Sequence, residues 1–292
     1  MLPVTEAIRA RLAGQIRALF ADPSGQRAVV PAPKDARLLP RGSVSFEVHA
    51  DVTTMMAGGI AALLLQMLHP KALAGVWDFS NFRRDMAGRL RRTAAFIAVT
   101  TFGTRAEAEA AIARVRRIHA RVEGRLPDGT PYRASDPRLL AFVGVTEALS
   151  FLAAWRRYRA PLMPMALQDR YIAELAVVAR LLGADPMPET RRAAEAFLAA
   201  CRPELRVDAR TREVARLLLG APPPRPALAP AHRLLMEAGV DLLPAWARRM
   251  HGLTRPLPAV PLVRAGTGSM GALLRWALAA PPPPVPAGAG TA

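Results

Sequence analysis

The sequence is poor in several residue types, and each shortage excludes a class of protein. Cys201 is the only cysteine, which excludes an internal disulfide and any multi-cysteine zinc or iron–sulfur site. Aromatic residues make up 5% of the chain and hydrophobic residues 51%, so a core must be built from Leu, Ala, Val and Met. Of the Asn-Gly and Asp-Gly dipeptides that favour hairpins, the chain has only Asp128-Gly129. Because Ala and Leu favour helices that pack closely, we predict an all-α fold, a multi-helix globular bundle.

Long apolar runs are also missing. The longest, Val52–Leu68, falls short of the ~20 residues that a membrane-spanning helix needs, and it contains Thr, Gln and two glycines. We interpret it as a buried core helix. The first residues show no apolar segment followed by a cleavage site, so a secretory signal is not expected. The expected location is therefore the cytoplasm.

Lysine occurs only twice, yet the formal net charge is +17, because arginine supplies nearly all of the positive charge. A strongly basic protein can bind nucleic acid, an anionic membrane or an acidic cofactor. Here the arginines are spread over most of the expected helices and no aromatic residues alternate with them. We therefore expect no nucleic-acid partner. Weak, salt-sensitive contact with an anionic membrane surface is the most that this charge predicts.

Apolar residues at helical spacing predict a series of helices. Asp51 is the expected N-cap of the core helix, Thr104 and Glu107 form a capping-box pattern, and Ser135 or Asp136 caps a later helix. The expected helices are Val4–Phe20, Val52–Leu68, Lys71–Trp77, Arg89–Thr100, Ala106–Val122, Leu139–Tyr158, Ala166–Leu182, Glu189–Ala200, Ala209–Leu219, His232–Ala238, Pro244–His251 and Gly271–Ala279.

Glycine-rich and proline-rich stretches divide these helices. Gly124–Arg133 and Gly266–Gly271 are expected to be loops, and Ala221–Pro230 an extended linker. The expected organisation is an N-terminal helix with a proline-rich lead-in (1–42), a main helical domain that carries the chemistry (43–220), a C-terminal helical appendage of the same domain (221–280) and a disordered tail (281–292).

Only five histidines occur, and two of them, His69 and His119, have strongly patterned surroundings. His119 is expected deep inside Ala106–Val122, among several arginines that include Arg117. A neutral imidazole can bind iron through one nitrogen while the other is held by an acceptor, and nearby arginines suit the anionic propionates of a haem. The structural alternative is a boundary histidine whose two nitrogens are both hydrogen-bonded.

Arg89 and Thr93 are four residues apart, so a helix presents both on one face, and Arg92 extends that basic face. They could steady dioxygen or a propionate at the edge of an apolar pocket. Alternatively, they are a surface arginine and a threonine bonded to the preceding turn. His69 ends the core helix before Pro70, where it either caps carbonyls with a cationic ring or faces a pocket.

Other catalytic patterns are absent from the sequence. It contains no HExxH, Walker A or GxSxG motif. Gly266–Gly271 has the spacing GxGxxG, but no convincing strand precedes it, so we interpret it as a loop. The remaining histidines lack patterned surroundings, and we interpret them as surface or packing residues: His49, His232 and His251. The residues therefore leave two options, a histidine-ligated cofactor or a purely structural helical protein.

Seven segments occur together in a consistent order: LLLQMLHP, AGVWDFSNFRRD, GRLRRTAAFI, TTFGT, VRRIHARVEG, PDGTPYRASDP and DRYIAELAVVARLLG. With them the chain resembles the oxygenase MpaB-like family, whose more distant relatives are the latex clearing proteins, which are rubber oxygenases. The likeness covers roughly Ala50–Gly220 and continues weakly to about Leu253.

The resemblance implies a globin-reminiscent helical core, haem b, and oxidative cleavage of C=C bonds in an apolar, isoprenoid substrate by dioxygen. It implies that His119 is the proximal ligand of the iron and that Arg89 and Thr93 line the oxygen pocket. We expect the iron at Nε2 of His119, with Arg92 and Arg117 beside the cofactor. His69 matches a His-Pro motif of the family and is expected to line the cavity.

The chain departs from the family pattern at Phe79, where many relatives carry a histidine, and it has no identifiable distal lysine. This motivates a second hypothesis, a non-catalytic helical protein that binds or senses haem or a lipid. The third is a structural helical module in which hydrogen bonds alone satisfy His69 and His119.

Overall fold

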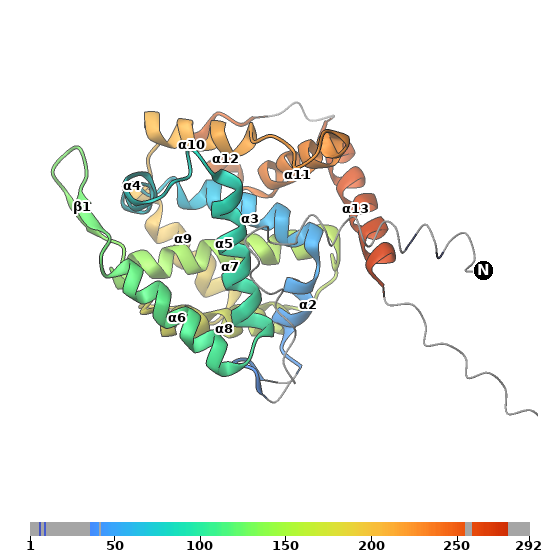
Figure 1. The fold of residues 1–292 in the computed structure, drawn as a ribbon, viewed down its shortest axis with the longest axis horizontal. Helices are drawn as coiled ribbons and strands as arrows, with labels where there is room; N and C mark the ends of the chain where they lie inside the picture. Colours follow the sequence, from blue (N-terminus) through green and yellow to red (C-terminus); the bar gives the residue numbers. More distant parts are fainter. Residues whose placement is uncertain (1–5, 7–8, 10–35, 41, 255–258, 280–292) are drawn as a thin grey trace, which may run out of the picture.

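The computed structural model describes residues 6, 9, 36–40, 42–254 and 259–279. The protein is mostly helical, as predicted, and its one sheet in this part of the chain is a small two-stranded hairpin (Figure 1). In chain order the elements are α2 (Val44–Ala50), α3 (Val52–Gln66), α4 (Pro70–Phe79), α5 (Met86–Phe102), α6 (Arg105–His119), β1 (Glu123–Arg125), β2 (Pro131–Arg133), α7 (Pro137–Tyr158), α8 (Met165–Leu182), α9 (Arg191–Cys201), the 3₁₀ turn η2 (Arg202–Glu204), α10 (Ala209–Leu219), the 3₁₀ turn η3 (Pro226–Leu228), α11 (Ala229–Leu242), α12 (Ala245–His251) and α13 (Ala259–Leu278).

The core forms around α3, which is apolar on every face and is packed between α7 and α11. A helix of this kind needs protein on all sides to exclude water. Two glycines let the backbones approach. A Cβ on Gly58 would lie 2.6 Å from Phe151 of α7, and one on Gly239 of α11 would lie 2.4 Å from Ile60 of α3. The interpretation of Val52–Leu68 as a buried helix is confirmed.

Local capping sets where several helices begin. The Asp51 carboxylate accepts a hydrogen bond from the Thr54 amide at the start of α3, at a point where the axes of α2 and α3 differ by 91°. Thr104 and Glu107 form the expected capping box of α6, and Asp136 caps α7. These side chains satisfy amide groups that the first helical turn leaves unpaired.

The C-terminal helices pack on the same core. Figure 1 shows α13 at one side of the helical body and the β1–β2 hairpin at the opposite side. Buried Asp241 of α11 binds Arg157 of α7 at 2.7 Å and Arg264 of α13 at 2.9 Å, and Arg248 of α12 lies 4.0 Å away. One carboxylate therefore joins four helices.

The structure corrects three of the expected connections. Gly124–Arg133 forms a β-hairpin rather than a loop, held to α4 by a 2.6 Å hydrogen bond from the Tyr132 hydroxyl to Asp78. Gly266–Gly271 lies within α13, where the lack of a side chain at Gly266 and Gly271 lets this helix approach α11 and α3. Ala221–Pro230 is not wholly extended, because it contains η3 and the start of α11. The expected helix Val4–Phe20, apart from residues 6 and 9, and the tail 281–292 lie outside the described residues.

One helix in the described part of the chain, α7, is long and apolar enough to cross a membrane, and α2 with α3 qualifies only as a sharply bent pair. However, 67% of the apolar window in α7 is buried inside the protein, against α3, α8 and α9. A core helix meets the same criteria of length and composition as a membrane span.

Candidate active site

α5 and α6 carry most of the predicted site residues. The two helices are joined at Gly103–Thr104, and in Figure 1 they diverge from that connection. Arg89 lies near the start of α5 and His119 is the last residue of α6, so both lie toward the ends away from the connection. The expectation that His119 lies deep inside a helix is wrong. The helix ends there because the chain turns into β1, and the Val122 amide bonds to the His119 carbonyl.

The imidazole of His119 is partly buried. Its Nδ1 is enclosed and has no hydrogen-bond partner in the structure. Desolvation lowers the pKa of His119 from its ordinary value, which favours the neutral ring. A neutral imidazole with an unsatisfied nitrogen is the state that a metal-binding histidine requires, since a ring nitrogen with a free lone pair is the ligand.

The guanidinium of Arg89 has little compensation for its charge. It donates one hydrogen bond, from Nη1 to the hydroxyl of Ser80 at 3.3 Å, and no carboxylate of the described residues pairs with it. Desolvation, and then the charge of Arg92, lower the pKa of Arg89 from its ordinary value. A partly buried cation without an anion is costly, so this position is suited to an anionic ligand.

The other predicted residues of this region face solvent. Arg92 is exposed, with Nη1 3.6 Å from Asp85. Thr93 is exposed, and its hydroxyl donates to the carbonyl of Arg89 at 3.3 Å. Arg117 is exposed on α6. The structure therefore places Arg89, Arg92 and Thr93 on one helix, but the hydroxyl of Thr93 is directed to its own backbone.

A stretch of α5 next to Arg89 is left uncovered. The five consecutive residues Arg91–Ala95 are all exposed. Because an α-helix has about 3.6 residues per turn, five positions cover every face of the helix, so this part of α5 is exposed on all sides. Phe79 at the end of α4 is 53% exposed and Ile118, beside His119, is 52% exposed. We call Phe79, Arg89, Arg91–Ala95, Ile118 and His119 the α5–α6 region. It combines exposed apolar side chains with a buried cation and a neutral histidine.

His69 lies elsewhere and is fully engaged. Its Nδ1 accepts a hydrogen bond from the Lys71 amide at 3.3 Å and so caps the start of α4. Nε2 lies 3.6 Å from Glu204, and the ring packs on Phe142 with centroids 4.9 Å apart. Desolvation lowers the pKa of His69, although Glu204 partly opposes this. The expected cationic cap of the preceding helix is therefore wrong: an Nδ1 that accepts a hydrogen bond carries no proton.

Sequence reasoning missed a polar cluster inside the core. His49, interpreted as a surface or packing residue, bonds through Nδ1 to the Thr101 hydroxyl at 2.8 Å and through Nε2 to the Tyr171 hydroxyl at 3.0 Å. Burial lowers the pKa of His49 to about 3 and raises that of Glu147, on the adjacent α7, to about 7. The signal that could have revealed Glu147 is its position as the one charged residue in the apolar run from Leu139 to Trp155.

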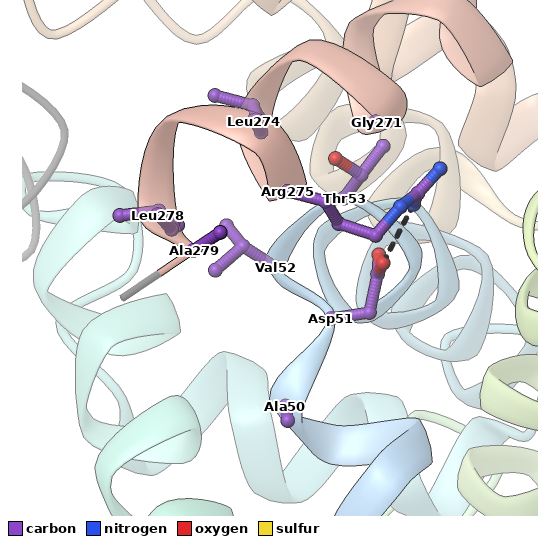
Figure 2. Close-up of a pocket in the computed structure, with 9 residues that line it drawn as sticks. All are labelled: Ala50, Asp51, Val52, Thr53, Gly271, Leu274, Arg275, Leu278 and Ala279. Atoms are coloured by element: carbon purple, nitrogen blue, oxygen red, sulfur yellow. Dashed lines mark hydrogen bonds and ion pairs between the residues drawn. The ribbon is translucent and has the colours of Figure 1, made fainter. Parts of the chain in front are cut away.

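The two best-defined cavities lie away from these residues. One, of about 190 Å³, lies between α13 and the bend from α2 to α3. Figure 2 shows its wall, where Arg275 reaches Asp51 at 2.7 Å while Val52, Leu274 and Leu278 supply apolar surface. The other, of about 560 Å³, is lined by the end of α10, by α11 and by the end of α12. Neither includes the α5–α6 region.

A protein-only metal site is not seen in the described part of the chain, where no three His, Cys, Asp or Glu side chains gather. Residues 46–277 match the sequence family described as the catalytic domain of ER-bound oxygenase mpaB/B′ and rubber oxygenase. The match begins in α2 and extends through most of α13, further than the motifs alone indicated. No curated protein and no solved structure matches the chain.

Proposed function

The chain belongs to the family of mpaB and rubber oxygenase catalytic domains, and we propose that it is a haem-b-dependent oxygenase of an apolar, isoprenoid-like substrate. The observation that carries the proposal is the neutral imidazole of His119, to which no described residue gives a hydrogen bond. The absence of a three-ligand cluster among the described residues fits this, because a porphyrin supplies most of the ligands of its iron and needs one or two from the protein.

The residues of the α5–α6 region fit the cofactor. Because Nδ1 of His119 is enclosed, the iron would bind at the other ring nitrogen, Nε2, and Nδ1 would carry the proton of the neutral ring. Arg89 would take a propionate, which provides the anion that this guanidinium lacks. Arg92 and Arg117, both exposed, would contribute a more strongly screened positive field.

When bound, the haem supplies the iron that activates dioxygen. Cleavage of a C=C bond by one dioxygen molecule gives two carbonyl groups, so the reaction balances without a further reductant. Phe79, Ile118 and the alanines of Arg91–Ala95 would hold the apolar chain and exclude water. The hydroxyl of Thr93 would orient dioxygen only after leaving the Arg89 carbonyl.

The test is the absorption spectrum of protein expressed with a haem precursor. The wild type should show a Soret band, and His119→Ala should lose it. His232→Ala, which removes a partly exposed histidine beside the 560 Å³ cavity, is the matched control and should keep it. A colourless wild type that also refuses added haemin would show that the proposal is wrong.

A non-catalytic binding protein is the second candidate. The exposed Phe79, at a position where many relatives carry a histidine, favours it, because a binder can lose reactive polar groups and keep its apolar surface. This candidate expects haem or lipid binding without oxygen consumption across a panel of terpenoids. Turnover of any of them, followed with an oxygen electrode, would eliminate it.

We also propose a cytoplasmic location with salt-sensitive contact at anionic membranes. The net charge of +17 supports it, since attraction between charges weakens as salt rises, whereas the exposed Leu262, Leu273 and Trp276 on α13 would favour insertion. Cosedimentation with anionic vesicles should fall as salt rises from low to high concentration. Binding that survives high salt would mean that α13 inserts its apolar side chains, and the proposed location would then be wrong.

A further inference from the structure

The larger cavity, of about 560 Å³, takes no part in the proposed reaction. We call it the α11 cavity, and its walls come from within residues 219–223, 229–240 and 252–254. α10 packs on α4, whereas α11 packs on α3 and α13, so the two helices rest on different parts of the body and a hollow remains between them. In Figure 1 they lie toward the opposite side of the body from α6 and α8. Pockets for small organic ligands typically have volumes of about 300 to 1,000 Å³.

Much of the wall of the α11 cavity is apolar. Met236 and Val240 of α11 are largely covered by protein and border the cavity with what remains accessible. They are four residues apart, so they lie on the same face of the helix. Leu219, Pro223 and Leu253 add apolar surface from the segments opposite. An aliphatic ligand would therefore meet hydrocarbon from three parts of the chain.

Polar side chains line the same cavity. His232 lies one turn before Met236 on α11, and Arg233 follows it. Neither side chain bonds or pairs with a described residue, and the same holds for the hydroxyl of Thr254. Glu237 also lines the cavity, but it is already engaged, and not by Arg233. The groups available to a ligand are thus a guanidinium, an imidazole and a hydroxyl.

The chemistry of these groups selects the ligand. A guanidinium only donates hydrogen bonds, and it offers two parallel N–H groups that match the two oxygens of a carboxylate. Desolvation lowers the pKa of His232, and a neutral ring still donates from one nitrogen. One cation with neutral donors beside it balances a single negative charge. The α11 cavity therefore suits a ligand with one anionic head and an aliphatic body.

We propose that the α11 cavity binds an aliphatic monocarboxylate, with its head held by Arg233 and His232 and its chain lying against Met236 and Val240. The inference goes beyond the proposed function and does not depend on it, because the cavity includes no residue of the α5–α6 region. A ligand there would contact α10, α11 and the end of α12 together. Since it would bind the folded chain alone, it should also raise the temperature of unfolding.

Calorimetric titration with decanoate and decan-1-ol tests the proposal, because the two molecules share a ten-carbon chain and differ in the head. The wild type should bind decanoate about tenfold more tightly, the ratio that one charged hydrogen bond of about 1.5 kcal/mol supplies. Arg233→Gln should abolish this preference by weakening decanoate binding alone. Arg212→Gln removes an exposed arginine of α10 that does not line the cavity, and it should leave both affinities unchanged. Far-ultraviolet circular dichroism confirms that each variant is folded.

Three outcomes of the titrations would overturn the inference. They are no binding of decanoate to the wild type, a preference that survives in Arg233→Gln or falls equally in Arg212→Gln, and tighter binding of decyltrimethylammonium than of decanoate, which would indicate a cation site.

The haem spectrum of the same samples separates this inference from the haem proposal. A Soret band without a preference for decanoate rejects only the carboxylate site, and a preference that depends on Arg233 in a colourless protein rejects only the haem proposal. Loss of the Soret band in His232→Ala would mean that the α11 cavity holds the haem, and the carboxylate site would then be wrong.

Discussion

Two regions of the protein differ in whether their buried or partly buried ionisable groups have partners within the described chain. At the junction of α7, α11, α12 and α13, the Asp241 side chain is 2% exposed and is surrounded by three arginines. In the half of the molecule built on α5, α6 and the middle of α7, no described residue supplies a carboxylate to Arg89 or a hydrogen bond to Nδ1 of His119 or to the carboxyl group of Glu147. The first region is satisfied by the chain itself, and the second is not.

The difference separates groups that hold the fold from groups that await a ligand. A buried charge with well-placed partners is close to neutral for stability and fixes the helices that carry it. A buried polar group without a partner lowers stability and persists in a fold when something else satisfies it in use. The predictions below alter one side of this contrast at a time.

The largest effect is expected from Asp241→Asn. The substitution keeps the shape but removes the charge that Arg157, Arg248 and Arg264 share, and should lower the free energy of unfolding by about 3 kcal/mol. Urea denaturation measures it. Asp85→Asn, at an exposed pair with Arg92, is the control and should cost less than about 1 kcal/mol. An equal loss of unfolding free energy in the two variants would contradict the distinction drawn between the two regions.

The next effect is a pH dependence that comes from Glu147. Its folded pKa of about 7 exceeds the ordinary 4.5, so between these values the unfolded chain ionises while the folded chain holds the proton. As pH rises through this window, the free energy of unfolding of the wild type should therefore fall relative to that of Glu147→Gln. The total change should reach about 2 to 3 kcal/mol by pH 8.

The nearby titratable groups are His49, Tyr171 and Glu174, contributed by α2 and α8. The lowered pKa of His49 and the raised pKa of Tyr171 keep both neutral in the fold from pH 5 to 8, and all three groups are present in both proteins. The difference between the two stability curves hence isolates Glu147. A difference that does not change with pH would mean that its carboxyl is solvated. Glu109→Gln, at an exposed position of α6, should show that flat result.

A smaller effect is expected from Arg89→Gln. It removes the cation proposed to bind a propionate and should weaken haem binding about tenfold, corresponding to about 1.5 kcal/mol for a charged hydrogen bond. The apoprotein should lose little stability, because Arg89 makes one long hydrogen bond and pairs with no carboxylate of the described residues. Arg92→Gln, at an exposed position, should weaken haem binding less than threefold. Spectrophotometric haem titration compares the affinities of the two variants. Equal weakening would mean that Arg89 does not bind the cofactor.

The smallest effect is expected from His69, whose ring nitrogens have partners, and it is compared with the effect of changing His119, whose Nδ1 has none among the described residues. His69→Ala removes the cap of α4 and the contact with Phe142, and should lower the free energy of unfolding by about 1 kcal/mol while leaving the haem spectrum unchanged. His119→Ala should have the reverse pattern. Loss of the Soret band in His69→Ala would restore His69 as a pocket residue.

Features encoded within a few residues were predictable from the sequence. The caps at Asp51, Thr104 and Asp136, and the burial of Val52–Leu68, follow from side chains that act on their own helix or from uniform apolarity. The family assignment is likewise confirmed, because it uses the order of many motifs rather than any one residue. These signals identify helices without determining how the helices meet.

Features that depend on distant contacts were not predictable. Gly266–Gly271 has the composition of a loop and is helical, because α13 packs closely on α11 and α3. His119 has the pattern of a mid-helix residue, but the hairpin that follows ends the helix. Within the site, His49 and Glu147 are about a hundred residues apart in the sequence, and only the packing of α2 against α7 and α8 brings their surroundings together.

The pairing of Asp51 with Arg275 has a consequence for synthesis on the ribosome. The two residues are 224 positions apart, and Arg264, on the same helix α13, completes the arginines around Asp241. Until α13 has emerged, Asp51 lacks its partner Arg275 and Asp241 lacks its partner Arg264. Both carboxylates must then remain hydrated. Folding during translation should therefore stop at an open intermediate, and the domain should close only when α13 leaves the exit tunnel.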